Sequence, residues 1–265
     1  MTQHCEADGA IRVERSGHVL LIGIDRPAKY NAFSKAMAIE LGDAFAALES
    51  DDEIRVGMLH AFGRNFTAGV QLDQIGEWFA AGRRLGQDGK PDPFDLQPPL
   101  RTKPIVAAVQ GYCFTVAIEL MLAVDIVIAA DDARFGQIEV KRGIFANHGA
   151  TLRIVERAGW GNAMRYLLTG DEFDAATALR LGLVQEVVPA GRQFDRALAI
   201  AEVIAAQAPL AVRETIRSAR RAVFEGWPAA IADLGPAQAR LMKSDDAAEG
   251  VASFMERRAG TFRGT

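Results

Sequence analysis

Residues 105–140, IVAAVQGYCFTVAIELMLAVDIVIAADDARFGQIEV, decide the fold. Ile105–Val109 and Ile126–Ala130 are short apolar runs typical of buried strands, and a short apolar stretch lies between them. Two carboxylates, Glu119 and Glu139, stand in this apolar setting. Burying a carboxylate costs several kcal/mol unless it is paired or used, so both glutamates are candidate functional residues.

The composition indicates a globular protein with a sizeable core in one or two domains. The chain has 265 residues, of which 49% are apolar and 24% charged, with a net charge of −4. This charge gives no positive footprint for nucleic acid, and no basic run suits an acidic membrane surface. No apolar run is long enough to span a membrane, and the N-terminus has no hydrophobic signal region, so we expect a cytoplasmic protein. Cys5, Cys113 and four scattered histidines show no metal-like spacing, so no metal site is expected.

Upstream of the central stretch, alternating and apolar runs predict strands and one long helix. Ile11–Arg15 and His18–Asp25 read as a hairpin, and Val56–His60 as a third strand. Ser34 is a plausible N-cap for a helix that runs to about Ser50.

Residues 82–103, rich in glycine and proline, lie just upstream of the central stretch and are expected to form a mobile excursion that could serve as a lid. Downstream of the central stretch, strands give way to helices. Residues 149–158 and 162–169 read as helices, and Asp174 as the cap of a third helix that Gly182 ends. From about Phe194 the chain is predicted to be nearly all helix.

This C-terminal helical stretch is expected to break at Pro209, Pro228 and Pro236. It is apolar on one side and too thin to form a core alone. We therefore expect it to pack on the first domain or on a neighbouring subunit.

Two features of the residues point to chemistry. Residues 62–72 and 110–117 are glycine-bearing loops after strands, whose free backbone N–H groups can bind an anion or a developing oxyanion. Two glutamates in one apolar pocket tend to have pKa values that are raised and split, which suits one to give and one to take a proton. The combination indicates acid–base chemistry beside a polarised carbonyl.

At these residues the sequence resembles the crotonase family, the enoyl-CoA hydratase/isomerase superfamily, over nearly the whole chain. The matching segments are Arg26-Pro27 with Asn31-Ala32-Phe33, Phe66–Leu72, Gln110-Gly111-Tyr112 followed by Glu119-Leu120, Phe135–Glu139, and Glu249–Arg258. The resemblance implies that Glu119 and Glu139 are catalytic and that the backbone N–H groups of Val70 and Val116 form an oxyanion hole. Substrate-binding positions implied in the same way are Lys29, Ala68, Gly69, Leu72, Gly111 and Arg257.

The sequence departs from the family pattern before the first glutamate. Thr115-Val116-Ala117 replaces a glycine triplet, and we expect Val116 to add bulk and to exclude glycine-only backbone angles. Gln71 replaces an acidic residue of the first loop. These changes bear on the shape of the hole and the acyl pocket.

Simpler interpretations stand beside the functional ones. Glu119 could be a structural carboxylate satisfied by a backbone or tyrosine partner, and Glu139 could face solvent. His148 could reach the pocket, cap the next helix or face solvent. Cys113 fits a small buried filler. Lys29 and Arg257 could contact coenzyme A phosphates or simply be solvated, and the side chains that could line an acyl tunnel or pack locally are Trp78, Phe79 and Phe94.

The resemblance implies an α/β crotonase-like spiral of ββα units over residues 1–195, with a helical trimerisation region over residues 196–265. The implied function is enoyl-CoA hydratase, with syn addition of water to a trans-2-enoyl thioester and assembly as a homotrimer or hexamer. No metal or other cofactor is expected, because coenzyme A is part of the substrate. Alternatives are another acyl-CoA enzyme of the same scaffold (an isomerase, or a thioester or C–C bond hydrolase), or a catalytically weak acyl-CoA-binding protein.

Overall fold

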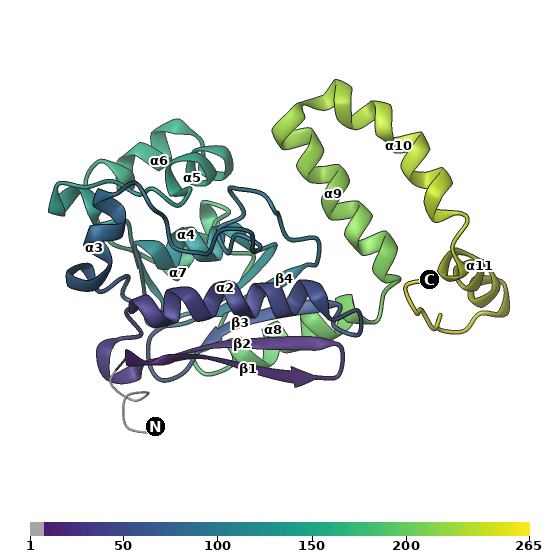
Figure 1. The fold of residues 1–265 in the computed structure, drawn as a ribbon, viewed down its shortest axis with the longest axis horizontal. Helices are drawn as coiled ribbons and strands as arrows, with labels where there is room; N and C mark the ends of the chain where they lie inside the picture. Colours follow the sequence, from purple (N-terminus) through teal and green to yellow (C-terminus); the bar gives the residue numbers. More distant parts are fainter. Residues whose placement is uncertain (1–7) are drawn as a thin grey trace.

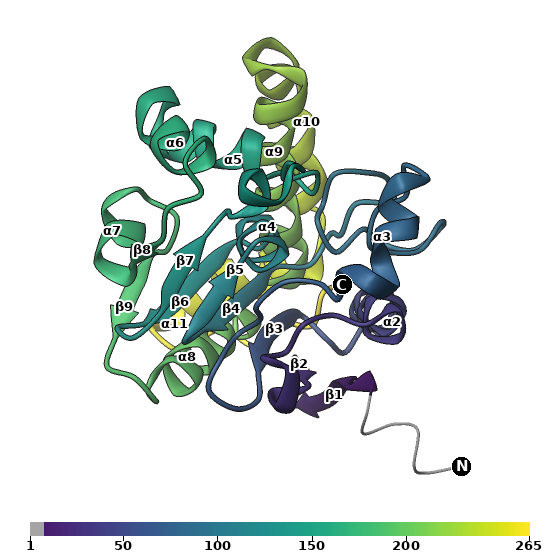
Figure 2. The ribbon, with the colours of Figure 1, turned by 90° about the vertical axis from the view of Figure 1, so that its left-hand side faces the viewer.

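The computed structural model describes residues 8–265, so Cys5 lies outside the described part. A six-stranded sheet forms the centre of the molecule (Figures 1 and 2). In spatial order its strands are β1 (Ala10–Ser16), β2 (Val19–Asp25), β3 (Val56–Ala61), β4 (Ile105–Val109), β6 (Ile126–Ala130) and β9 (Glu186–Val188). Among the named strands of this sheet, β1 and β2 pair antiparallel and the other neighbours pair in parallel. Every residue of β3 and β4 is buried, as expected for central parallel strands covered on both faces.

A second, three-stranded sheet carries the site. It contains β5 (Tyr112–Phe114), β7 (Arg134–Gly136) and β8 (Phe173–Asp174). The helix α4 (Val116–Ala123) follows β5 directly, and the short 3-10 helix η2 (Glu139–Arg142) follows β7. Because β5 and β7 pair in parallel, their carboxyl ends lie at one edge, and this brings the two predicted glutamates together.

Helices cover both faces of the main sheet. On one face lie α2 (Lys35–Ser50) and α4, and on the other lies α8 (Gln193–Ala205). α8 packs through Ala197, Ala201 and Ala205, whose small side chains let the helix approach the strands closely. The predicted boundary between residues 195 and 196 falls inside this helix.

The described part of the body contains four further α-helices and one further 3-10 helix. They are α3 (Leu72–Ala80), α5 (Ala150–Ala158), α6 (Trp160–Leu167) and α7 (Ala175–Arg180), with η1 (Pro27–Lys29) after β2. Between α3 and β4 runs a segment without helix or strand, residues 81–104, here called the strap. The strap is anchored by buried side chains, among them Leu85 and Phe94, and by a hydrogen bond from Arg153 Nη2 to the Phe94 carbonyl at 2.7 Å.

The last three helices, α9 (Pro209–Glu225), α10 (Trp227–Leu241) and α11 (Asp245–Glu256), form an arm that reaches away from the body (Figure 1). Arg220 on α9 ties the arm to the strap through an ion pair with Asp95 at 2.6 Å. The predicted breaks at Pro209 and Pro228 are confirmed, because each proline stands in the first turn of its helix, where its missing N–H has no partner to lose.

The predicted break at Pro236 is wrong, because α10 continues through it. A proline inside a helix frees the carbonyl four residues before it. Here that carbonyl belongs to Ala232, which is exposed, as Pro236 is. Solvent can therefore hydrate the freed group, and the arm has no tightly packed core that would exclude the ring.

Candidate active site

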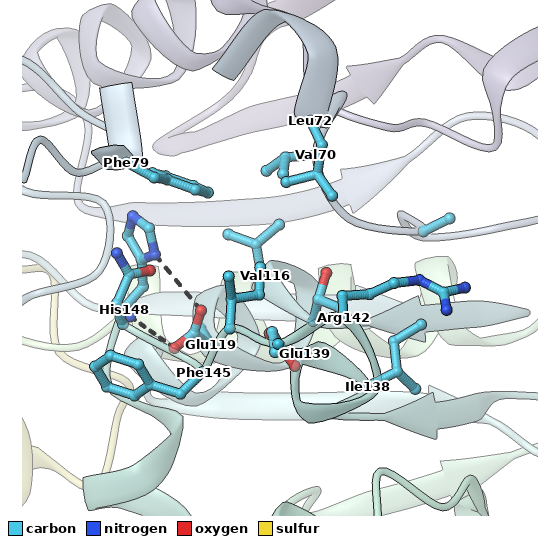
Figure 3. Close-up of a pocket in the computed structure, with 15 residues that line it drawn as sticks. Val70, Leu72, Phe79, Val116, Glu119, Ile138, Glu139, Arg142, Phe145 and His148 are labelled. Atoms are coloured by element: carbon cyan, nitrogen blue, oxygen red, sulfur yellow. Dashed lines mark hydrogen bonds and ion pairs between the residues drawn. The ribbon is translucent and has the colours of Figure 1, made fainter. Parts of the chain in front are cut away.

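A cavity of about 400 Å³ opens where the N-terminus of α4, the segment after β3 and the loop after η2 meet. Its lining is mainly apolar and includes both predicted glutamates. Figure 3 shows Phe79 and Val70 on one side, Glu119 and Glu139 on the opposite side, and Val116 between them. This arrangement is a carboxylate pair facing an apolar wall.

Glu119 lies in the first turn of α4 and is 2% exposed. Its Oε1 accepts hydrogen bonds from the backbone N–H groups of His148, at 2.7 Å, and Ala150, at 3.2 Å. Its Oε2 lies 3.5 Å from His148 Nδ1. Oε1 of Glu119 therefore has the backbone partners expected of a structural carboxylate. The side chain nevertheless also lines the cavity.

Glu139 begins η2 and is 8% exposed, so it does not face bulk solvent. Burial, and after it the negative charge of Glu119, raise the pKa of Glu139 from 4.5 to about 7, although the residue's own backbone N–H opposes the shift. Within residues 8–265, Glu139 Oε2 has no hydrogen-bond partner. The structure therefore offers one carboxyl that can hold a proton near neutral pH beside one that accepts two amide hydrogen bonds.

The start of α4 supplies a free backbone donor. Val116 is the first residue of the helix, and its N–H donates to no acceptor in the described chain. As expected, Val116 does not adopt glycine-only backbone angles, because it is already helical. Those angles occur one residue earlier, at Thr115, with φ 55° and ψ −118°, because the sharp turn from β5 precedes the first helical residue. A β-branched residue is strained there.

Val70 supplies a second backbone N–H at the cavity, and that group also lacks an acceptor among the residues described. The loop is fixed by its neighbours, because Phe33 N donates to Gly69 O and Gln71 N to Phe33 O, both at 2.9 Å. Gly69 has φ +119°, and a Cβ there would lie 2.4 Å from Thr115 Oγ1. Glycine thus lets this loop lie against the turn before α4.

Other predicted substrate contacts divide into two groups. Ala68 and Leu72 line the cavity, whereas Lys29, Gly69, Gly111 and Arg257 do not. Gly111 has φ +53°, and a Cβ there would lie 2.3 Å from the Arg64 carbonyl oxygen, which accounts for glycine at that position. The roles of Lys29 and Arg257, which are both exposed, stay predictions.

Among the aromatic candidates, Phe79 lines the cavity, whereas Phe94 lies in the main hydrophobic core and Trp78 packs against that core. Cys113 is fully buried, as predicted for a small filler. Sequence reasoning missed Arg142, which ends η2 and lines the cavity. Figure 3 shows its side chain pointing away from Glu119.

His148 is the residue whose importance the sequence understated. It is 1% exposed and lines the cavity beside Glu119, so it neither faces solvent nor sits free in the loop. Its backbone N–H and its ring both face the carboxylate of Glu119. Its only sequence signal was the position after the second glutamate.

In residues 8–265 no three His, Cys, Asp or Glu side chains are grouped so as to hold a metal ion. Over the same residues no helix has both the length and the apolar character that crossing a membrane requires.

Comparison with known proteins gives consistent matches over nearly the full chain. A family model described as enoyl-CoA hydratase/isomerase matches residues 14–265. The enoyl-CoA hydratase EchA19 of Mycobacterium tuberculosis is 33% identical over 260 residues, covering 95% of both chains. The carnitinyl-CoA dehydratase of Proteus mirabilis is 33% identical over 263 residues, covering 96% of this chain and 98% of the relative. The crystal structure of a "probable enoyl-CoA hydratase/isomerase" from Mycobacterium abscessus superposes with a TM-score of 0.93 at 46% identity, covering 97% of this chain and 99% of that one.

Proposed function

The chain belongs to the enoyl-CoA hydratase/isomerase family, the crotonase superfamily, and from that membership we propose that it is an enoyl-CoA hydratase acting on a trans-2-enoyl-CoA thioester. The observation that carries the proposal is a cavity shared by two buried glutamates of different character and by two backbone N–H groups that have no acceptor within residues 8–265. Relatives that match at similar identity are named as hydratases and dehydratases, which supports addition or removal of water as the reaction type.

The backbone N–H groups of Val70 and Val116 hold the thioester carbonyl oxygen in this proposal. Electron density moves onto that oxygen as a nucleophile adds to C3, and preorganised donors stabilise the resulting enolate. The first-turn position of Val116 adds the partial positive charge of the α4 N-terminus. Loss of one such donor typically slows a reaction by about 10²–10³-fold.

The two glutamates divide the work on water. Glu119 accepts a proton from the water as its oxygen bonds to C3, and Glu139 donates a proton to C2 of the enolate. Glu139, with a pKa raised to about 7, retains a proton in a large fraction of molecules near neutral pH. Transfer of a proton from Glu119 to Glu139 then restores both groups. Because both carboxyls lie on one side of the cavity, hydrogen and hydroxyl reach the same face of the double bond, which gives syn addition.

The test is the loss of enoyl absorbance with crotonyl-CoA and with a longer 2-enoyl-CoA. We expect turnover in the wild type and a fall in kcat of about 10²–10⁴-fold in both Glu119→Gln and Glu139→Gln. Glu156→Gln, which changes an exposed glutamate on α5, serves as the matched control and should retain wild-type activity. Absence of turnover on both thioesters, in folded protein that still binds coenzyme A, would reject the proposal. Recovery of an isomerised or hydrolysed thioester would instead identify the protein as an isomerase or a hydrolase of the same scaffold.

A further inference from the structure

The ring of His148 is held in a closed environment next to Glu119. It is 1% exposed and lies between two aromatic rings, with centroid distances of 5.6 Å to Phe79 and 4.4 Å to Phe94. Phe79 belongs to α3 and Phe94 to the strap. A ring packed in this way cannot turn out toward solvent without moving both elements.

The hydrogen bonds of the ring fix its tautomer. The backbone N–H of Leu85 donates to His148 Nε2 at 2.9 Å. A backbone amide can only donate, so Nε2 must offer a lone pair, and the proton of the neutral ring is on Nδ1. That N–H faces Glu119 Oε2 at 3.5 Å, close enough for electrostatic attraction in a buried setting.

The contacts of Glu119 divide its two oxygens into separate roles. Oε1 is occupied by the two backbone donors, His148 N and Ala150 N. Oε2 faces His148 Nδ1 and remains the oxygen available to water. His148 therefore contacts both oxygens of Glu119: its backbone N–H donates to Oε1, and its ring faces Oε2.

We infer that His148 is a positioning residue for Glu119, held as the Nδ1–H tautomer by the Leu85 amide so that the strap sets the orientation of the carboxylate. The inference rests on the proposed function, because Glu119 is the group that accepts the proton from water. His148 itself is not the base, since Nδ1 carries a proton and Nε2 is occupied by Leu85. Contacts from Leu85 to His148 and from His148 to Glu119 thus connect the strap to the reacting centre.

Three substitutions separate the donor role from packing. In His148→Asn the side-chain amide takes the place of Nδ1–H, in His148→Gln the amide lies near the place of Nε2, and His148→Leu removes both. We expect kcat on crotonyl-CoA to fall by about 10- to 100-fold in the Leu and Gln variants, because the base loses its orientation. His148→Asn should stay within about 5-fold of wild type, and KM should change by less than about 3-fold in all three.

A purely structural role predicts a different pattern. Equal losses in the Asn and Leu variants, wild-type kcat in all three, or changes confined to KM would each overturn the inference. Circular dichroism and Tm of each variant establish that the kinetic comparison is made between folded proteins.

A second measurement does not depend on turnover. The chain has four histidines, so selective ring-¹⁵N labelling gives few signals, and the His148 signal is the one absent from His148→Asn. We expect it to show a protonated Nδ1 and an unprotonated, hydrogen-bonded Nε2. An Nε2–H tautomer would refute the positioning role even if the wild type hydrates enoyl thioesters. Conversely, the Nδ1–H tautomer in a protein without hydratase turnover would retain the Glu119–His148 pairing and reject only the proposed reaction.

Discussion

Glu139 combines a buried carboxyl with an oxygen that has no hydrogen-bond partner in residues 8–265. Its pKa is raised to about 7 in the folded protein, against 4.5 ordinarily, first because of burial. The folded state therefore binds this proton more tightly than the unfolded state does. Stability contributed by the protonated group is present below about pH 4.5 and is lost as the pH rises to about 7, by on the order of 3 kcal/mol.

Glu139→Gln removes this titration, so we expect its advantage in Tm over wild type to grow between about pH 5 and about pH 8, while its activity falls. Thermal unfolding at a series of pH values measures the difference. Glu202→Gln, at an exposed position of α8, is the control and should track wild type throughout. If the difference in Tm between Glu139→Gln and wild type stays constant across this pH range, the pKa of Glu139 is not raised in the folded protein.

The predictability of individual site residues depended on whether their signal was local. Glu119 stands out because a carboxylate in an apolar run is anomalous wherever it occurs, and Glu139 stands out because it ends the segment Phe135–Glu139, which resembles a family motif. His148 could not be assigned in this way, because its partners Leu85 and Glu119 lie 63 and 29 residues away in sequence. Only the fold brings that chain of contacts together.

At the scale of elements, the turn from β5 into α4 is the strained join of the site. Thr115 has φ 55° and ψ −118°, a region in which a β-branched residue costs about 1–3 kcal/mol. Thr115→Gly relieves this strain. The more flexible unfolded chain of the glycine variant offsets about 0.5–1 kcal/mol of the gained stability. We therefore expect a net stabilisation of about 1 kcal/mol, seen as a higher Tm, with hydratase activity retained because the N–H of Val116 remains.

Thr115→Ala is the matched control, since it removes the hydroxyl and the branch but keeps the Cβ that the backbone disfavours. It should show no comparable rise in Tm. If the alanine variant were stabilised as much as the glycine variant, the side chain rather than the backbone angle would be the source of the strain.

Helix boundaries show what sequence reveals about elements and what it does not. The predicted caps are confirmed: Ser34 Oγ accepts from Met37 N, and Asp174 from Thr177 N. Capping is a contact across three residues and is therefore visible in sequence. The error at Pro236 arose because the effect of proline depends on whether the freed carbonyl reaches water, and that is a tertiary property.

At the scale of the whole molecule, the arm leaves many of its apolar side chains exposed. No residue of α9 is buried. Several large apolar side chains of the arm are strongly exposed, among them Trp227 at 72%, Phe254 at 81% and Met255 at 76%. A surface of this kind marks an interaction site, and we expect a second and third copy of the chain to cover it in a trimer.

Trp227→Lys should therefore shift the protein from trimer to monomer in light scattering coupled to size exclusion. Val13→Lys, which changes a 47% exposed side chain on β1, is the control and should leave the assembly intact. A wild-type mass equal to the 28.6 kDa of a single chain at micromolar concentration would contradict the trimer.

The arm also bears on the abundance of the protein in a cell. A newly made chain whose arm is unpartnered displays the apolar surface that chaperones and proteases recognise. The steady-state amount of enzyme then depends on how quickly chains meet, as well as on how stable each one is. Substitutions on the arm would in that case lower the cellular level of the protein even though they lie far from the glutamates and leave the chemistry untouched.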